Sequence, residues 1–216
     1  MIEPDRPLLI LGTSRFSEEI ADVVSEIPGA RVVGFVENMD EERCGQKLSG
    51  LPVYWVEELS RFARTHEVIC GLGTTRRSIY IEQVVKYDPT FATLAHPSAR
   101  ISRTSCLGEG TFVGVGAVIA ARTDVGRHVV VNRGALIGHH TQVGDFVTVG
   151  PGGNIAGSCR IGRGAYLGMG AVIIDHLSVG AGSVVGAGSV VTRNVPDNVQ
   201  VVGVPARIVK ENMEAK

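Results

Sequence analysis

The sequence has few aromatic residues and no bias of charge, and both absences limit what the chain can do. Only 5% of its 216 residues are aromatic, and one of them is tryptophan. The 21 basic residues nearly balance the 22 acidic ones, and no basic block is interleaved with aromatic residues. This balance argues against a nucleic-acid partner and against an anionic membrane surface. We therefore expect a small molecule or a protein as the partner.

Cysteine and long hydrophobic runs are also scarce. The four cysteines (Cys44, Cys70, Cys106 and Cys159) show neither the CxxC spacing of a zinc or redox site nor the density of a disulfide scaffold. No apolar run reaches membrane-spanning length, and the first residues lack the pattern of a signal peptide. We expect a cytoplasmic protein with reduced cysteines and no metal.

Glycine is abundant, with 28 residues, and a repeat accounts for it. Counted in sixes from Ala95 to Val191, all seventeen consecutive hexads begin with Ala, Val, Ile or Leu. Glycine fills the next slot in more than half of them, and the fifth slot is small or β-branched apart from Leu177. One buried aliphatic residue per six suits neither a helix nor a single strand, but it suits a β-helix with flat faces.

The first 93 residues follow a different pattern, in which apolar strands alternate with helical segments. Strands are predicted over 8–14, 30–38 and 67–73, and helices over 16–27, 56–62 and 75–86. This alternation predicts a small parallel α/β sheet.

Ligands of such sheets bind beyond the carboxyl ends of the strands. The candidate substrate-binding residues are therefore Gly12, Ser14, Arg15, Phe16, Glu37, Asn38 and Gly73, with Arg15 as a partner for a phosphate. The first turn, GTSRFS, has a single glycine where a dinucleotide fingerprint has three, which argues against NAD.

The order of these parts, with LAHPSARIS before the repeats and VGVPARIV after them, resembles the NeuD and PglD type of sugar acetyltransferase in the hexapeptide-repeat superfamily. The resemblance implies a Rossmann-like sugar-nucleotide-binding domain over 1–93. It implies a left-handed parallel β-helix over 94–216, with three hexads per coil and a C-terminal cap that we expect to be a short helix. It also implies a homotrimer that holds acetyl-CoA at its subunit interface and acetylates the amine of a nucleotide-activated sugar for surface glycans.

Two adjacent histidines stand in the hexad IGHHTQ, at slots that project outward elsewhere in the repeat. The resemblance makes His139 the general base, and imidazole can accept a proton near neutral pH as the acceptor attacks the thioester. The family commonly has glutamate at the next position. Here that position holds His140, a second candidate catalytic residue, which when neutral cannot raise the basicity of His139 as a glutamate does. Asp145 or an acid of a partner subunit therefore remains an open candidate for that role.

Residues eighteen apart should stack on one face, so His139 should lie between Ala121 and Gly157. Glycine at that position would let a ligand approach the base closely. The resemblance adds coenzyme contacts at Thr148, Met169 and Ala187, and a place in the acceptor cleft for Asn132.

Three alternative functions remain open at this level. The chain could acetylate a hydroxyl of the sugar, or it could be a binding scaffold without catalysis. The third alternative is a zinc enzyme similar to the β-helical carbonic anhydrases. Against the zinc enzyme, His128 and His140 are two hexads apart and so fall on different faces, which leaves no clear cluster of three ligands.

Overall fold

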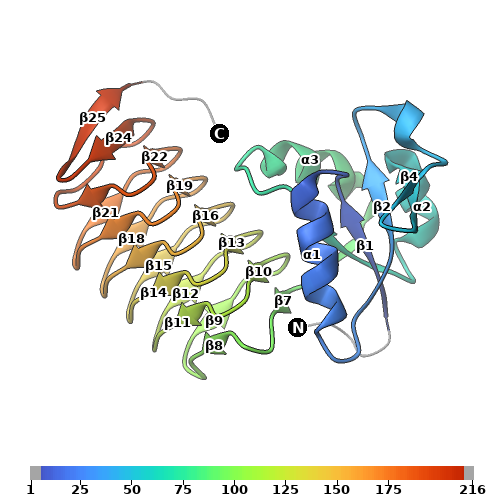
Figure 1. Cartoon of the computed structure of the whole chain (residues 1–216), viewed down its shortest axis with the longest axis horizontal. Helices are drawn as coiled ribbons and strands as arrows, with labels where there is room; N and C mark the ends of the chain where they lie inside the picture. Colours follow the sequence, from blue (N-terminus) through green and yellow to red (C-terminus); the bar gives the residue numbers. More distant parts are fainter. Residues whose placement is uncertain (1–5, 212–216) are drawn as a thin grey trace. The chain divides into compact units, whose positions relative to one another are not determined.

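The computed structural model describes residues 6–211 (Figure 1). The chain divides into two compact units between Pro97 and Ser98. Within this range, no helix combines the length and the apolar character that crossing a bilayer requires. The two units are described in turn.

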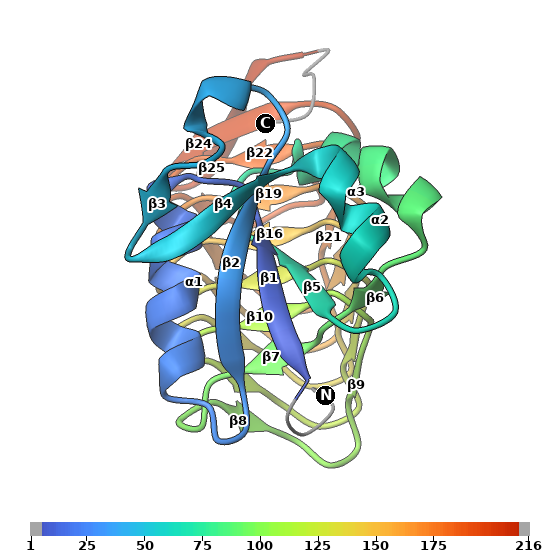
Figure 2. The same cartoon turned by 90° about the vertical axis from the view of Figure 1, so that its right-hand side faces the viewer.

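The N-terminal unit is built on a six-stranded sheet in the order β3-β4-β2-β1-β5-β6 (Figure 2). Its strands are β1 (Pro7–Leu11), β2 (Arg31–Glu37), β3 (Lys47–Leu48), β4 (Leu51–Trp55), β5 (Glu67–Cys70) and β6 (Thr90–Phe91). Its helices are α1 (Arg15–Ser25), α2 (Leu59–Phe62) and α3 (Arg77–Val84), with 3-10 turns at Glu41–Arg43, Val56–Glu58 and Val85–Tyr87. All strand pairs are parallel except β3 with β4. The chain leaves β1 for β2 on one side and returns to β5 on the other, so the strand order switches beside β1.

Sequence patterns located β1, β2, β5, α1 and α3 within a few residues, but they missed the β3–β4 hairpin. Its turn is Ser49 and Gly50, both at positive φ. A Ser-Gly pair between two short runs is a turn signal, yet a two-residue strand is too short to show a period.

The second unit is a β-helix of two-residue strands, and its coils stack in Figure 1. Strands pair in parallel with a residue offset of eighteen, as Val118 with Leu136 and Leu136 with Asn154. This register confirms the predicted period of three hexads per coil.

The strands form three faces, which we number. Face 1 contains β10 (Phe112–Val113), β13 (Val130–Val131), β16 (Thr148–Val149), β19 (Tyr166–Leu167), β22 (Val184–Val185), β24 (Gln200–Gly203) and β25 (Ala206–Lys210). Face 2 contains β8 (Arg100–Ile101), β11 (Val118–Ile119), β14 (Leu136–Ile137), β17 (Asn154–Ile155), β20 (Val172–Ile173) and β23 (Val190–Val191). Face 3 contains β9 (Cys106–Leu107), β12 (Asp124–Val125), β15 (Gln142–Val143), β18 (Arg160–Ile161) and β21 (Ser178–Val179). The short strand β7 (Leu94–Ala95) precedes them in the chain.

The aliphatic residue of each hexad points into the β-helix. Ile119, Ile137 and Ile155 on face 2 are each 1% exposed, and the small residues Ala117 and Ala135 are fully buried beside them. Glycine follows the aliphatic residue because the coils approach closely there. A methyl group on Gly138 would lie 2.5 Å from the carbonyl carbon of Ala156 in the next coil. The repeat thus encodes the core and the coil spacing together.

The end of the β-helix differs from the prediction of a short helical cap, which is wrong for the described residues. Strand β24 extends face 1 beside β22, and β25 folds back antiparallel on β24. The β-branched residues of QVVG and ARIVK favour a strand, and the hairpin pairs backbone groups that an exposed last strand would leave open. The rest of the predicted cap, 212–216, lies outside the described residues.

A ladder of charges ties neighbouring coils at the corner between faces 3 and 1. The Oδ1 atom of Asp145 accepts the backbone N–H of Arg127 at 2.8 Å, and Oδ2 accepts its Nη2 at 3.0 Å. Arg163 Nη1 donates to the same Oδ2 at 3.4 Å, and its guanidinium lies 4.5 Å from the centre of the Phe146 ring. Partial burial alone would raise the pKa of Asp145, but this N–H and the two guanidinium groups hold that pKa below its ordinary value.

We expect Asp145→Asn to lower the free energy of unfolding by about 1 kcal/mol at neutral pH, because it removes charge-assisted hydrogen bonds between coils. The pKa of Asp145 is lower in the folded protein than in the unfolded chain, where it is about 3.9. The carboxylate therefore stabilises the fold fully above the unfolded pKa. This contribution is lost as the pH falls through the folded pKa. Urea unfolding at pH 7 and at successively lower pH measures both effects. Asp124→Asn, at an exposed aspartate on β12, is the control. Equal stability of the two variants would contradict the stabilising role of Asp145 between coils.

Candidate active site

His139 and His140 lie in the turn that joins β14 on face 2 to β15 on face 3. Both side chains are exposed, so the predicted outward projection is confirmed. Their Nδ1 atoms are 3.0 Å apart, which is a hydrogen bond, and the two rings meet edge to face. His140 has a φ of +57°, which the tight turn imposes.

The stacking predicted from the period places His139 between Ala121 and Gly157. The backbone of His140 donates to Ala121 at 2.9 Å, and Ser158 donates to His139 at 2.8 Å. A methyl group on Gly157 would lie 2.6 Å from Cε1 and 2.8 Å from Nε2 of the His139 ring. The His139 imidazole therefore occupies the space that a side chain at position 157 would fill.

No carboxylate of the described chain supports His139. The prediction that Asp145 could take this part is wrong, because Asp145 lies at a different corner and both of its oxygens accept from arginines. Asp175 lies two coils above His139 and is 3.6 Å from Nε2 of its own neighbour, His176. The hydrogen-bonded partner of the His139 ring is His140.

The other β-helix residues that are predicted to contact acetyl-CoA or the acceptor lie away from His139. Asn132, Met169 and Ala187 occupy turns at the corner between faces 1 and 2, where Met169 is 60% exposed. Thr148 is on face 1 and is buried, with 2% of its surface exposed. Face 2 separates the corner of Met169 from the corner of His139, so one chain does not bring these residues together.

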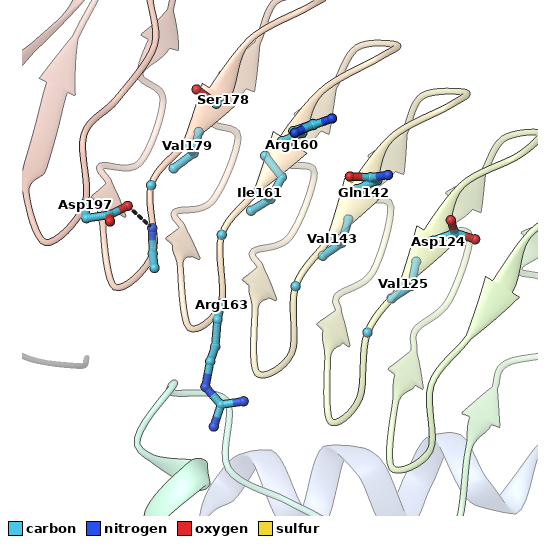
Figure 3. Close-up of a pocket in the computed structure, with 15 residues that line it drawn as sticks. Asp124, Val125, Gln142, Val143, Arg160, Ile161, Arg163, Ser178, Val179 and Asp197 are labelled. Atoms are coloured by element: carbon cyan, nitrogen blue, oxygen red, sulfur yellow. Dashed lines mark hydrogen bonds between the residues drawn. The ribbon is translucent and has the colours of Figure 1, made fainter.

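Face 2 differs from face 3 in the side chains that it presents outward. Face 2 presents the aliphatic side chains of Val118, Leu136, Val172 and Val190 beside two polar residues, Arg100 and Asn154, and Leu136 is 40% exposed. Face 3 presents polar side chains instead, and a shallow groove of about 510 Å³ runs along it (Figure 3). Its outward side chains are Asp124, Gln142, Arg160 and Ser178. None of the predicted site residues lines this groove.

In the N-terminal unit, three loops follow adjacent strands at the carboxyl edge of the sheet, as predicted. Gly12 has a φ of +104°, and Ser14 caps helix α1 by accepting the N–H of Ser17 at 3.3 Å. The hydroxyl of Ser14 also donates to the carbonyl of Gly71 at 3.1 Å, which ties the loop after β1 to the loop after β5. Arg15 is the exposed first residue of α1.

The side chain of Phe16 lies over Gly73. A methyl group on Gly73 would lie 3.5 Å from the Phe16 ring, which is ordinary contact. Phe16 and Gly73 thus lie against each other where the loops after β1 and β5 meet.

Glu37 ends β2, and its carboxylate is already engaged. Its Oε1 accepts the N–H groups of Asn38 at 2.9 Å and Met39 at 2.8 Å, and Oε2 accepts the hydroxyl of Thr13. Burial would raise the pKa of Glu37, but these hydrogen bonds hold that pKa below its ordinary value. Arg43 Nη1 donates to Thr13 at 2.9 Å.

Asn38, the residue after Glu37, is also tied to another element. Its Nδ2 donates to Oε1 of Gln83 on α3 at 2.7 Å. Sequence reasoning named Asn38 but missed Thr13, Arg43 and Gln83. Thr13 was in the named loop, whereas nothing local in the sequence joins Arg43 or Gln83 to it.

Metal ligands are not clustered in the part of the chain that the structure describes. Across residues 6–211, no group of three or more His, Cys, Asp or Glu side chains could hold a metal ion. The structure thus offers no support for the zinc-enzyme alternative.

Comparisons with known proteins agree with this fold. The family model for the bacterial transferase hexapeptide (six repeats) matches residues 158–193. Perosamine N-acetyltransferase from Caulobacter crescentus, solved as a histidine-to-asparagine variant with CoA and GDP-perosamine, is 29% identical with a TM-score of 0.88 over 95% of this chain and 97% of that one. No curated protein sequence matches the chain.

Two further solved structures cover nearly all of both chains. The acetyltransferase domain of PglB from Neisseria gonorrhoeae, in complex with acetyl coenzyme A, is 25% identical with a TM-score of 0.85 over 95% of this chain and 100% of that one. WeeI from Acinetobacter baumannii is 27% identical with a TM-score of 0.84 over 94% and 99%. These matches support a left-handed β-helix of the hexapeptide-transferase kind for the second unit.

Proposed function

Because the chain belongs to the NeuD and PglD type of sugar acetyltransferase in the hexapeptide-repeat superfamily, we propose that it transfers an acetyl group from acetyl-CoA to the amine of a nucleotide-linked amino sugar. One observation carries the proposal. The exposed imidazole of His139 lies in the space above Gly157, in a chain that matches an enzyme solved with CoA and GDP-perosamine over 95% of its length.

The chemistry needs one base. The amine nitrogen of the sugar attacks the acetyl carbonyl carbon, the carbon–sulfur bond breaks, and the CoA thiolate leaves. His139 accepts the proton that the amine nitrogen loses, since imidazole can do so near neutral pH, and the proton is returned to the thiolate. The products are an N-acetylated sugar and CoA with a free thiol.

The nucleotide part of the acceptor fits the carboxyl edge of the N-terminal sheet, as in Rossmann-like domains. Helix α1 is 11 residues long and directs its N-terminus, capped by Ser14, into that edge, which suits a diphosphate. Arg15 and Arg43 supply positive charge there. The carboxylate of Glu37 orders the loop through its bonds to Asn38, Met39 and Thr13, so the loop atoms rather than Glu37 itself are left to meet the ligand.

The separation of the two corners supports a homotrimer with its sites between subunits. If three copies pack with their apolar faces 2 around a common axis, the His139 corner of each copy meets the Met169 corner of the next. Acetyl-CoA would then bind between a base from one copy and coenzyme contacts from another. This arrangement also covers Leu136, which is 40% exposed in a lone chain, and the partly exposed Val118, Val172 and Val190.

We expect Leu136→Glu to convert the trimer to monomers and to abolish acetyl transfer, because it would place three carboxylates in an apolar interface. Light scattering after size-exclusion chromatography measures the mass, and circular dichroism checks the fold. Gln142→Glu adds the same charge on face 3 and should leave mass and activity unchanged. Full activity of a monomeric protein would contradict the shared site.

Thiol release from acetyl-CoA tests the proposed activity across UDP-, GDP- and dTDP-linked amino sugars. We expect turnover with at least one of them and none with the matching sugars that lack the amine. Coenzyme binding without thiol release for every sugar in the panel would contradict the proposal.

A further inference from the structure

We propose that His140 is a positioning residue that fixes the tautomer of His139, with a neutral imidazole in the place where the family commonly has a carboxylate. The inference rests on the proposed acetyl transfer and deepens it. It starts from the contact of 3.0 Å between the two Nδ1 atoms.

The hydrogen bond and the proposed mechanism together assign the protons. One Nδ1 must donate and the other must accept, because two neutral nitrogen lone pairs facing each other would repel. A base that works through Nε2 needs a free lone pair there, so the proton of His139 is on Nδ1. His139 Nδ1–H therefore donates to His140 Nδ1, and His140 carries its own proton on Nε2.

The backbone of the turn does not account for a histidine at this position. The residues stacked in the column of His140 share its left-handed conformation, with φ of +55° at Arg122, +59° at Ser158 and +59° at His176. Three different residue types thus serve the same turn. What is particular to His140 is an acceptor nitrogen within reach of His139.

The groups that neighbour the pair belong to the turns below and above it. The turn below contributes Ala121 and the exposed Arg122, and the turn above contributes Gly157, Ser158 and the buried thiol of Cys159. Asp175 and His176 follow one coil further up. None of these groups is bonded to Nδ1 of His140 in the described structure. Protonation of His140 would therefore remove the acceptor lone pair and leave His139 without its partner.

Three substitutions separate positioning from folding. His140→Asn keeps an acceptor that does not titrate and tolerates positive φ, and His140→Glu supplies an acceptor with negative charge. His140→Ala has no acceptor. We expect His140→Ala to lower kcat by about 10- to 100-fold with little change in KM, the range seen when the partner behind a metal-ligating imidazole is removed.

We expect His140→Asn and His140→Glu to keep most of the activity. In His140→Glu, the fall of kcat on the acid side should move to higher pH than in His140→Asn, because a carboxylate favours the protonated imidazole. His176→Ala, at an exposed histidine in the same column, should behave as wild type.

The outcomes separate this inference from the proposed function. Wild-type turnover that is lost in His139→Ala but unchanged in His140→Ala would overturn the positioning role and leave acetyl transfer standing. Nitrogen-15 NMR of the two imidazoles tests the bond without any substrate. When both imidazoles are uncharged, we expect the proton of His139 on Nδ1 and the proton of His140 on Nε2. Protons on Nε2 of both rings would overturn the inference.

Discussion

Replacement of His139 by alanine is expected to lower kcat for acetyl transfer by about 10²- to 10⁴-fold, the contribution of a positioned general base. Without the imidazole, the amine must lose its proton to water as the carbon–nitrogen bond forms. The exposed side chain contributes little to packing, so the melting temperature should change by no more than a degree or two. Steady-state thiol release and calorimetry measure the two effects.

The control for this substitution is His176→Ala. His176 is also exposed in a turn between faces 2 and 3, but its ring lies 3.6 Å from the carboxylate of Asp175. It should keep wild-type kcat. Activity in His139→Ala equal to that of His176→Ala would remove His139 from the mechanism.

The second large effect is expected from Gly157→Ala, which should lower kcat by about 100-fold. The new methyl group would lie 2.6 Å from Cε1 of His139, so the ring must move out of its place by an ångström or so. Misplacement of a catalytic group by about 1 Å can cost about 100-fold in rate. The backbone of Gly157 lies outside the left-handed region, so alanine adds no backbone strain there.

A crystal structure and thermal unfolding of Gly157→Ala would separate displacement from destabilisation. We expect an unchanged fold with a rotated His139 ring. Ser158→Ala, one residue further, removes a side chain without approaching that ring and should retain activity. Normal kcat in Gly157→Ala would mean that the position of the ring over Gly157 is not the reactive one.

Much of the fold follows from the sequence because the repeat is redundant. Every hexad supplies an inward aliphatic residue, and most add a glycine where coils approach closely and a small or β-branched residue in the fifth slot. Ile119, Ile137 and Ile155 therefore stack as the period requires. The two fold predictions that failed, at the β3–β4 hairpin and at the ARIVK strand, both concern segments without repetition. The ARIVK strand was taken for a helix because a single short segment has no period to decide it.

The candidate site shows the same division. The period placed His139 over Gly157, since both belong to one column. The period did not show which way the side chains of neighbouring turns point. Asp145 accepts hydrogen bonds from Arg127 and Arg163 at a different corner of the β-helix. The contact between His139 and His140 was also missed, because adjacent residues in a turn can point apart or together and only the backbone conformation decides.

The most direct test is to identify the atom that receives the acetyl group. Wild-type protein is incubated with acetyl-CoA labelled with carbon-13 at the carbonyl and with the nucleotide-linked amino sugar that releases thiol, labelled with nitrogen-15 at its amine, and the product is examined by NMR. The account predicts a labelled amide carbon coupled to the former amine nitrogen, formed by wild type and not by His139→Ala. A labelled ester on a sugar hydroxyl, or a labelled amide formed equally by both proteins, would contradict it.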